Sequence, residues 1–331
     1  MGTSILHQES SNVLLKSLFK SYYSKAELVE PSDIEMREFA IQPIGYGSYI
    51  RHLSFTSITE LKSFILENLP LHLYYSSARY AIPAAKEMEE KGWLGSDLLF
   101  DVDADEVCKD LKRINFCPTC GSIVQGVGKC PIDGSEVVEY VEINKECLES
   151  TIKNTLTLIE ILENDFGFLG VVTFSGNRGF HVRVECKDEC GLLGQEERKE
   201  IVDYIKGEKV PEINVTPDSP SWIGRKVRGV KSVVLDEQVT IDVRRLERVE
   251  NSINGKSGLL VKRVNDLANF TIDESLSPFN GYVIIIPKVS MKINIFDRVL
   301  EMNKNIPIRV EASIGVYLHL KSLGEMKAYV R

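Results

Sequence analysis

The sequence lacks the features that would place a protein in a membrane or send it out of the cell. No apolar stretch reaches the ~18 residues that a membrane-spanning helix needs. The N-terminus, MGTSILHQES, has no basic-then-apolar signal pattern and no Ser or Thr at position 6 for N-myristoylation. We therefore expect a cytoplasmic protein without a membrane partner.

The sequence also lacks an excess of positive charge. Its 40 lysines and arginines stand against 48 aspartates and glutamates, a net charge of −8, which argues against indiscriminate binding of polyanions. Basic side chains nevertheless gather between 224 and 248, and such a run is either a solvated face or a local contact for a template backbone. Its members are Arg225, Lys226, Arg228, Lys231, Arg244, Arg245 and Arg248.

The sequence also lacks an even number of cysteines. Its seven cysteines in 331 residues do not resemble a secreted disulfide framework. CPTCG at 117–121 is instead typical of a zinc knuckle, and GKCPIDG at 128–134 resembles its partner, with Asp133 where a second cysteine is expected. The predicted structural zinc ligands are Cys108, Cys117, Cys120 and Cys130, with three cysteines plus Asp133 as the alternative. Cys147, Cys186 and Cys190 are expected to be ordinary thiols.

The alternation of expected strands and helices favours an α/β (α+β) body, which is expected to span 1–331 as one unit. Two insertions interrupt it, a cysteine-rich lobe at 104–134 and a helical piece with a proline-containing connector at 188–234. Helices are expected at 13–27, 60–69, 148–163, 195–207 and 295–303. Strands are expected at 37–41, 49–55, 71–80, 97–105 and 281–287, with a strand–turn–strand unit at 169–185.

The stretch LLFDVDADEV, 98–107, turns from apolar to acidic. On a strand, Asp101 and Asp103 share one face ~6.6 Å apart, where they repel each other unless a cation lies between them. Oxygen ligands suit Mg²⁺ or Mn²⁺, and a pair of such ions holds the attacking and leaving oxygens of a phosphoryl transfer. The alternative is a helix cap by Asp103 or Asp105. Asp105 is assigned to such a cap or to the cysteine lobe.

The stretch SGNRGFHV, 175–182, predicts a tight glycine turn between two strands. The forked guanidinium of Arg178 fits phosphate oxygens, and His181 lies with Arg183 on one face of the second strand. Ser175, Arg178 and His181 are therefore expected to converge on an anion. The alternative is a plain hairpin with an exposed arginine and a half-buried histidine.

Taken in order, these motifs resemble the catalytic (small) subunit of archaeal and eukaryotic-type DNA primases, and the chain length favours the archaeal branch. LLFDVDAD is similar to the first metal motif of that family, and SGNRGFHV to its Ser-Gly-x-Arg-Gly-x-His motif, with CPTCG between them. LDEQVTIDVRRLERVENSINGKSGL, 235–259, resembles the third motif, while REFAI and YIRHLSF resemble N-terminal blocks. The resemblance implies a mixed-sheet primase-type core.

The resemblance assigns roles to further residues. Asp236 completes the carboxylate set of Asp101 and Asp103, and nucleotide binding extends to Glu38, Arg51 and Arg248. Asn254 stands where the family usually has a histidine. It can hydrogen-bond a phosphate or sugar oxygen but cannot carry charge.

The resemblance implies template-directed synthesis of short RNA primers on single-stranded DNA from nucleoside triphosphates, with deoxynucleotides as further substrates. Catalytic Mg²⁺ or Mn²⁺ and structural Zn²⁺ are the implied cofactors. The implied partners are a primase large subunit that carries an iron–sulfur cluster, the template, an RNA or DNA primer and the replication machinery. The alternatives are a repair or end-joining primase-polymerase, a non-catalytic zinc-containing nucleic-acid-binding module, and a glycosyltransferase using D-x-D.

Overall fold

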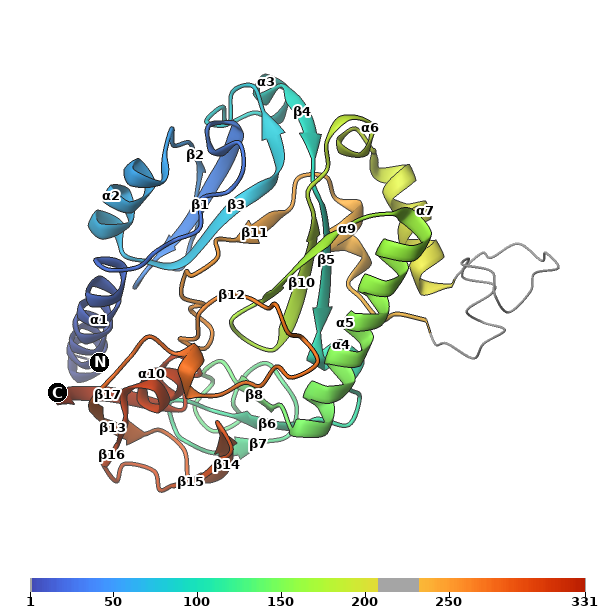
Figure 1. Cartoon of the computed structure of the whole chain (residues 1–331). Coiled ribbons are helices and arrows are strands. Elements are labelled where there is room, and N and C mark those ends of the chain that lie inside the picture. Colours follow the sequence, from blue (N-terminus) through green and yellow to red (C-terminus); the bar gives the residue numbers. More distant parts are fainter. Residues whose placement is uncertain (1, 208–231, 331) are drawn as a thin grey trace.

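Five antiparallel sheets organise residues 2–207 and 232–330, the part of the protein that the computed structural model describes (Figure 1). Every strand pairing within it is antiparallel. Helices accompany the sheets, which confirms the α/β (α+β) class. The expected mixed sheet is wrong for the described residues, because none of their strands pairs in parallel. No helix in these two ranges is both long and apolar enough to cross a membrane.

The N-terminal sheet has the order β11-β3-β1-β2, and β4 also pairs with β3. Its strands are β1 (Arg37–Pro43), β2 (Ile50–Leu53), β3 (Pro70–Tyr80), β4 (Trp93–Ser96) and β11 (Leu246–Arg248). The helices of this region are α1 (Gly2–Tyr23), α2 (Ile58–Asn68), α3 (Met88–Lys91) and a 3-10 turn (Ile34–Met36). The helix α2 is capped, because Ser57 Oγ accepts a hydrogen bond from the Glu60 N–H.

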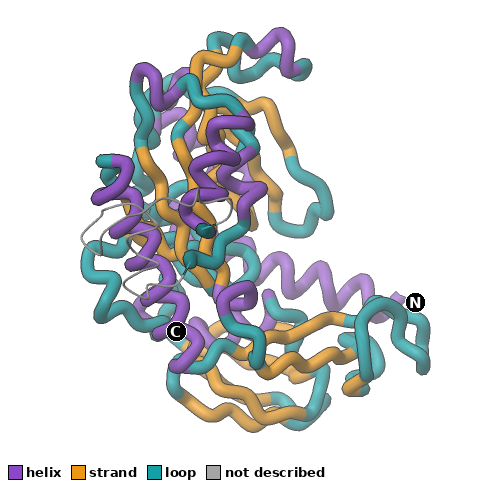
Figure 2. Tube along the Cα trace, turned by 90° about the vertical axis from the view of Figure 1, so that its right-hand side faces the viewer, coloured by secondary structure: helices purple, strands orange, loops and turns teal. Residues whose placement is uncertain are grey.

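The central sheet has the order β12-β9-β10-β5. Its strands are β5 (Leu98–Asp103), β9 (Gly170–Phe174), β10 (Gly179–Val184) and β12 (Lys262–Arg263). The nearby helices are α4 (Ala104–Val107), α5 (Lys145–Phe166), α6 (Asp188–Gly191), α7 (Gln195–Lys206) and α9 (Glu237–Ile241). Turned by 90°, the trace shows strands inside and helices along their outer side (Figure 2). A core of fully buried residues such as Phe100, Leu158 and Val202 joins β5, α5 and α7.

The knuckle sheet, β7-β6-β8, carries the cysteines, and the C-terminal sheet, β16-β13-β17, lies beside it (Figure 1). The knuckle strands are β6 (Lys112–Phe116), β7 (Ile123–Val124) and β8 (Val138–Glu142). The C-terminal elements are β13 (Tyr282–Pro287), β14 (Met291–Ile295), β15 (Arg298–Met302), β16 (Ile308–Glu311), α10 (Ala312–Leu320), β17 (Gly324–Val330) and a 3-10 turn (Glu274–Leu276). A second core joins the C-terminal sheet to α1, β1 and β3.

Two helix predictions need correction. The first helix spans Gly2–Tyr23 rather than 13–27, because a helix continues through polar residues that show no apolar periodicity. The predicted helix at 295–303 is wrong, because β14 and β15 form a hairpin there. Phe296 and Asp297 take φ of 50° and 58° in its two-residue turn. The limits of the insertions at 104–134 and 188–234 stay predictions, and 208–231 lies outside the described residues.

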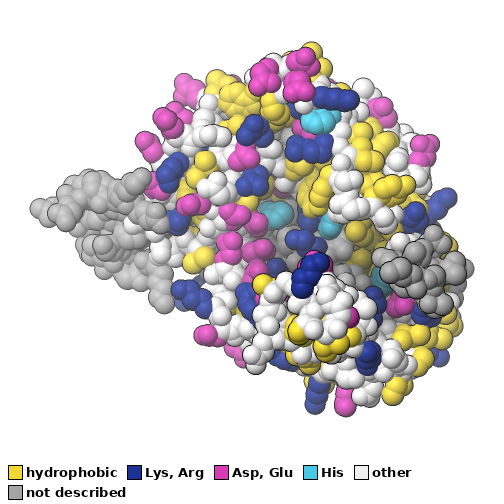
Figure 3. All heavy atoms as spheres, turned by 180° about the vertical axis from the view of Figure 1, so that it is seen from behind, with side chains coloured by type: hydrophobic (Ala, Val, Ile, Leu, Met, Phe, Trp, Pro, Cys, Tyr) yellow, Lys and Arg dark blue, Asp and Glu magenta, His cyan; other side chains and the backbone are white. Residues whose placement is uncertain are grey.

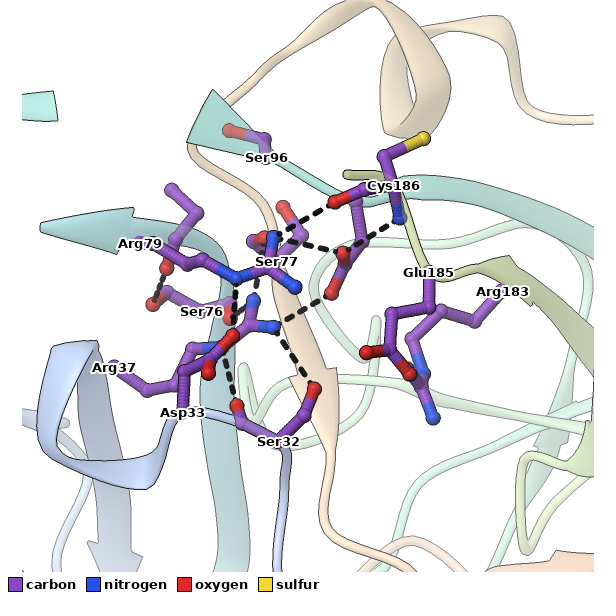
Figure 4. Close-up of polar contacts among 12 residues, drawn as sticks. Ser32, Asp33, Arg37, Ser76, Ser77, Arg79, Ser96, Arg183, Glu185 and Cys186 are labelled. Atoms are coloured by element: carbon purple, nitrogen blue, oxygen red, sulfur yellow. Dashed lines mark hydrogen bonds and ion pairs between the residues drawn. The ribbon is translucent and has the colours of Figure 1, made fainter. Parts of the chain in front are cut away.

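A buried ion pair holds the N-terminal sheet against the start of β5. Asp97, just before β5, accepts from Arg37 Nη2 at 2.8 Å, and neither side chain is exposed at all. Arg79 Nη1 lies 3.0 Å from the other oxygen of Asp97, and the Cys186 N–H donates to that oxygen at 3.1 Å. Figure 4 shows Arg37 and Arg79 converging from β1 and β3. These contacts set where β5 begins and thus where its acidic end lies.

Candidate active site and zinc cluster

The carboxylates of the stretch 98–107 lie on one face of β5. Leu98, Phe100 and Val102 are fully buried, whereas Asp101 and Asp103 alternate with them and are half-buried. Asp103 stands at the N-cap position of α4, yet its side chain makes no capping hydrogen bond. The cap interpretation is therefore wrong for Asp103, and both carboxylates lie on the face that a metal site requires.

The predicted glycine turn brings β10 alongside β5. The strand register places His181 opposite Asp101, with Nε2 3.6 Å from Oδ1. The turn is closed because the Ser175 N–H donates to the Gly179 carbonyl oxygen at 2.9 Å and the Gly179 N–H to Ser175 Oγ at 3.3 Å. A Cβ at Gly179 would lie 2.3 Å from the Val102 carbonyl oxygen, so glycine is needed for this approach.

Asp236 reaches β5 from a distant part of the sequence. Its backbone N–H donates to the Asp101 carbonyl oxygen at 3.0 Å, and its side chain caps α9 by accepting from the Gln238 N–H at 3.0 Å. The acidic group that resemblance implied is thus assembled from β5 and the start of α9. Within the described residues, the ligand oxygens of the three aspartates do not all lie within 4.8 Å of one another.

Mutual repulsion and burial disturb these acids. Burial and the charge of Asp236 raise the pKa of Asp101 to about 6, and burial and the charge of Asp101 raise the pKa of Asp103 to about 6. The pKa of Glu106 rises to about 7, through burial and then the neighbouring aspartates. Asp101 Oδ1 is buried without a hydrogen-bond partner. An unpaired buried oxygen among repelling carboxylates fits a divalent cation.

Arg178 lies at the turn and is paired. Its Nη2 is 3.0 Å from Asp105 Oδ2, and its buried Nε has no hydrogen-bond partner. The sequence assigns Asp105 to a helix cap or to the cysteine lobe. That assignment is wrong, because Asp105 pairs instead with Arg178 of the hairpin. The hydrogen-bonding capacity of Arg178 is only partly used, so it can bind phosphate oxygens in place of Asp105.

Arg248, on β11, is buried beside the acids. Its guanidinium carbon lies 4.6 Å from the centre of the Tyr74 ring, and Nη1 lies 2.9 Å from His72 Nδ1. Burial and then the charge of Arg248 lower the pKa of His72 to about 3, so this ring is neutral and accepts. The charge of Arg248 in turn lowers the pKa of Asp101, against the effect of burial.

Glu38 and Arg51 lie together on neighbouring strands. Glu38 is buried and lies 3.0 Å from Arg51 Nε and 3.3 Å from Lys91 Nζ. Its carboxylate is thus occupied by two cations, whereas the Arg51 side chain is 44% exposed. Arg51 is the member of this pair that a nucleotide can reach.

Asn254 is buried behind the hairpin. Its Nδ2 donates to the Ser175 carbonyl oxygen at 2.8 Å, and its Oδ1 accepts from the Lys256 N–H at 2.9 Å. Both polar ends are engaged with protein, so the geometry suits positioning of the turn and of Lys256.

The basic run at 224–248 is only partly described. Arg244 and Arg245 lie 3.4 and 3.7 Å from Asp242, while Arg225, Lys226, Arg228 and Lys231 lie outside the described residues.

Three charged residues near the acids were missed by sequence reasoning. Glu106 follows the acidic stretch directly, and Lys256 lies two residues after Asn254, so both had a local signal. Lys321 comes from the C-terminal segment, which has no pattern that points to it. Seen from behind, acidic, basic and histidine side chains gather across the middle of the surface (Figure 3).

The residues of the knuckles that could hold a metal ion are Cys117, Cys120, Cys130 and Asp133. Their ligand atoms all lie within 4.8 Å of one another. No other group of at least three His, Cys, Asp or Glu side chains among the described residues meets this condition. The alternative with Asp133 is therefore favoured, and Cys108 is not part of the set. Hydrogen bonds, first from the Ser135 N–H, lower the pKa of Asp133 to about 2, so it is ionised. Three thiolates and a carboxylate are consistent with a closed zinc site.

Repetition explains this ligand set. The Cys117 N–H donates to the Ser122 carbonyl oxygen, and the Cys130 N–H donates in the same way to that of Ser135. Each knuckle is thus the same turn, with its second ligand three residues after the first. In the second knuckle that position is Asp133, whose short carboxylate takes the place of a thiolate.

The structure joins four of the cysteines as disulfides, which corrects two predictions. Cys108 pairs with Cys147, because α4 packs on the start of α5, and Cys186 pairs with Cys190. Cys147, Cys186 and Cys190 are therefore not ordinary thiols. The first bridge ties the segment after β5 to α5, the helix that covers the central sheet.

Repelling carboxylates beside guanidinium donors are what a metal-dependent nucleotidyl transfer requires, and the fold and the site are consistent with this class of protein. Residues 132–266 match a family model described as "DNA primase small subunit", and residues 281–330 match a model of a primase C-terminal domain. The polymerase domain of Mycobacterium tuberculosis Ligase D, in complex with DNA, is similar at a TM-score of 0.37 with 9% identity, over 79% of its own length and 78% of the present protein. That likeness is too low to support an argument.

Curated relatives extend the match over the whole chain. The DNA primase small subunit PriS of Saccharolobus islandicus (strain M.14.25 / Kamchatka #1) is 54% identical over 100% of both chains. The corresponding subunit of Sulfolobus acidocaldarius is 46% identical over 100% of both, and that of Staphylothermus marinus is 36% identical over 96% of both. The chain belongs to the DNA primase small subunit family. It is an archaeal-type catalytic small subunit, a nucleotidyltransferase that synthesises primers, and the family implies a large-subunit partner, a DNA template and a catalytic metal.

Proposed function

We propose that this chain joins ribonucleoside triphosphates into short RNA primers along single-stranded DNA, with Asp101, Asp103 and Asp236 holding two Mg²⁺ or Mn²⁺ ions. One observation carries the proposal: the Asp236 N–H donates to the Asp101 carbonyl oxygen, so three mutually repelling carboxylates gather opposite a basic turn. When bound, such ions activate the attacking 3′-hydroxyl and stabilise charge on the α-phosphate and the leaving pyrophosphate.

The basic side chains act by positioning and electrostatics. Arg178 and Arg248 bind phosphate oxygens, and Ser175 and His181 orient the nucleotide at the turn. Arg178 exchanges Asp105 for phosphate, which its 3.0 Å ion pair at a half-buried site permits. Arg51 contacts the nucleotide, whereas Glu38 holds Arg51 in place. Asn254 acts through the turn, since its side chain donates to the Ser175 carbonyl oxygen.

The cysteine cluster serves folding. Three thiolates and Asp133 leave no ligand position open, so a zinc ion there stabilises the knuckles without meeting substrate. The proposed partners are a primase large subunit in a heterodimer, the single-stranded template, an RNA or DNA primer, and the replication machinery. Deoxynucleotides are proposed as further substrates.

The test is a primer-free assay of the chain with its large subunit, using single-stranded DNA, ribonucleoside or deoxynucleoside triphosphates and Mg²⁺ or Mn²⁺. Products that depend on template and are lost with Asp101→Asn support the proposal. Asp110→Asn is the matched control, because Asp110 is exposed a few residues further along the sequence. Normal synthesis by Asp101→Asn would refute the metal assignment.

The same assay separates the alternative activity. A repair or end-joining primase-polymerase extends existing primers with deoxynucleotides and does so without the large subunit. Extension without de novo products would therefore favour that alternative over primer synthesis. Template binding without any synthesis would favour a non-catalytic nucleic-acid-binding module.

A further inference from the structure

Lys321 connects the C-terminal part of the protein to the glycine turn at 175–179. It follows α10 directly, and its backbone N–H donates to the Tyr317 carbonyl oxygen at 2.9 Å, which ends the helix. Its side chain contacts the turn between β9 and β10, where Nζ donates a hydrogen bond to Asn177 Oδ1 at 2.8 Å. Nζ also lies 5.4 Å from the centre of the Tyr317 ring.

The surroundings of Lys321 are unusually positive for a half-buried lysine. Arg178 and Lys256 are its cationic neighbours, and burial followed by these two charges lowers the pKa of Lys321 to about 7. Asp105 is the carboxylate that opposes them, but it already lies 3.0 Å from Arg178 Nη2. Two cations therefore act on Lys321 against one carboxylate, which is already paired with Arg178.

Such a cluster is unfavourable in the free protein and becomes favourable when an anion joins it. Withdrawing a lysine from water beside two cations costs free energy that Asp105, already paired with Arg178, does not offset. The C-terminal end of α10 helps the ammonium only modestly. The buried Nε of Arg178 has no hydrogen-bond partner and adds an unused donor to the same place. The missing component is an anion with several oxygens.

We propose that Lys321 is a further contact for the terminal phosphates of the incoming nucleoside triphosphate. The C-terminal region thereby supplies one cation to the site that the turn 175–179 builds. This inference rests on the function proposed above, because a triphosphate is the polyanion that such an enzyme brings to this turn. Asn177 holds the ammonium in place until the phosphates arrive.

The test measures nucleotide dependence of primer synthesis for Lys321→Gln, Lys321→Ala and Lys321→Arg. Gln and Ala are expected to raise KM for the nucleoside triphosphate about tenfold, the usual scale for one charge-assisted hydrogen bond, with kcat little changed. Arg retains the charge and is expected to restore most of the affinity. Lys327→Gln, a C-terminal lysine 2.7 Å from Glu325, is the control and should behave as wild type.

A second readout separates phosphate binding from a merely structural contact. Inorganic tripolyphosphate should inhibit the wild-type protein, and Lys321→Gln should need about ten times more of it. Binding of a nucleoside 5′-monophosphate should not change, because that ligand lacks the terminal phosphates. Unfolding temperatures of all variants are compared to show that the fold is intact.

The outcomes are distinct. If wild-type protein makes no primers, the proposed function fails. If wild-type protein is active but Lys321→Gln keeps the wild-type KM and tripolyphosphate inhibition, only the role of Lys321 is refuted. Equal weakening of monophosphate and triphosphate binding would likewise refute it, because Lys321 would then act by holding Asn177 and the turn.

Discussion

The backbone N–H of Asp236 donates a hydrogen bond to the carbonyl oxygen of Asp101 at 3.0 Å. Backbone atoms make this contact, so it places the third carboxylate beside the strand end whatever the charge on either side chain. The acids are thereby held together although they repel one another, and the pKa of Asp101 rises to about 6, through burial first and the charge of Asp236 second. The backbone sustains an arrangement whose repulsion is relieved by a bound cation or by protonation.

Substitution of Asp236 separates catalysis from folding. Asp236→Asn keeps an N-cap side chain for α9 and the backbone hydrogen bond, so stability should stay near that of wild type. Synthesis should fall at least about 100-fold, because a charged metal ligand is lost. Asp236→Ala should lose activity equally and also about 1 kcal/mol of stability, since the cap is gone. Primer synthesis and urea unfolding measure the two effects; an active Asp236→Asn protein would contradict the assignment.

The repulsion predicts a pH dependence of stability in buffer without divalent cations. The folded-state pKa values of Asp101 and Asp103 are raised to about 6, above the ordinary value of about 4. Ionisation therefore disfavours the fold: stability is highest when both acids are protonated, and it falls as the pH rises from about 4 to about 6. A pKa rise from about 4 to about 6 corresponds to about 3 kcal/mol, so the loss for the coupled pair is on the order of 3–5 kcal/mol.

The matched control is a protein with both Asp101→Asn and Asp103→Asn. Its free energy of unfolding should equal that of wild type near pH 4 and exceed it above pH 6. Added Mg²⁺ or Mn²⁺ should remove the difference above pH 6 by stabilising wild type alone. Denaturant titrations across this range measure it, and parallel curves at every pH would show that the carboxylates do not repel.

Local sequence patterns predict two parts of the candidate active site, the carboxylates of β5 and the glycine turn. Alternation along 98–103 puts Asp101 and Asp103 on one strand face, and the glycines of 175–179 demand a tight turn, so sequence alone defines both. Asp236 entered through resemblance, because nothing local in its sequence indicates the contact with β5. Lys321 shows no local signal, since only tertiary packing brings α10 to the turn.

The errors have related causes. Cys108 is the nearest cysteine upstream of the knuckles in sequence, but α4 packs against α5 and delivers Cys147 to it instead. Apolar residues at 295–303 satisfy a helical period and a strand period at once, and the two-residue turn at Phe296 and Asp297 decides for the hairpin.

Zinc content tests the revised ligand set. Cys117→Ser and Asp133→Ala should lose most of the bound zinc, whereas Cys108→Ser should keep the wild-type content, measured by elemental analysis after dialysis. Asp133→Cys should also keep it, because a thiolate then occupies the equivalent place of the first knuckle. Loss of zinc from Cys108→Ser alone would restore the four-cysteine interpretation.

The Cys108–Cys147 bridge has its own expected effect. Closing 39 residues of sequence stabilises the fold by about 3–4 kcal/mol in the loop-entropy model, and engineered cases often show less. Cys108→Ser should therefore lower the free energy of unfolding under oxidising conditions and have little effect in the presence of a reductant. A difference that persists in reductant would indicate a packing role for the Cys108 sulfur.

The ion pair of Arg37 and Asp97 predicts the largest loss of stability from a single polar change. Asp97→Asn leaves the buried guanidinium of Arg37 without its counter-charge, which should cost about 3–5 kcal/mol. The exposed pair of Arg113 and Glu139 is the control, because Arg113→Ala should cost at most about 1 kcal/mol. Denaturant unfolding measures both. Since Asp97 directly precedes β5, activity of Asp97→Asn should fall even where the protein remains folded, and full activity would show that the acidic strand end does not depend on this contact.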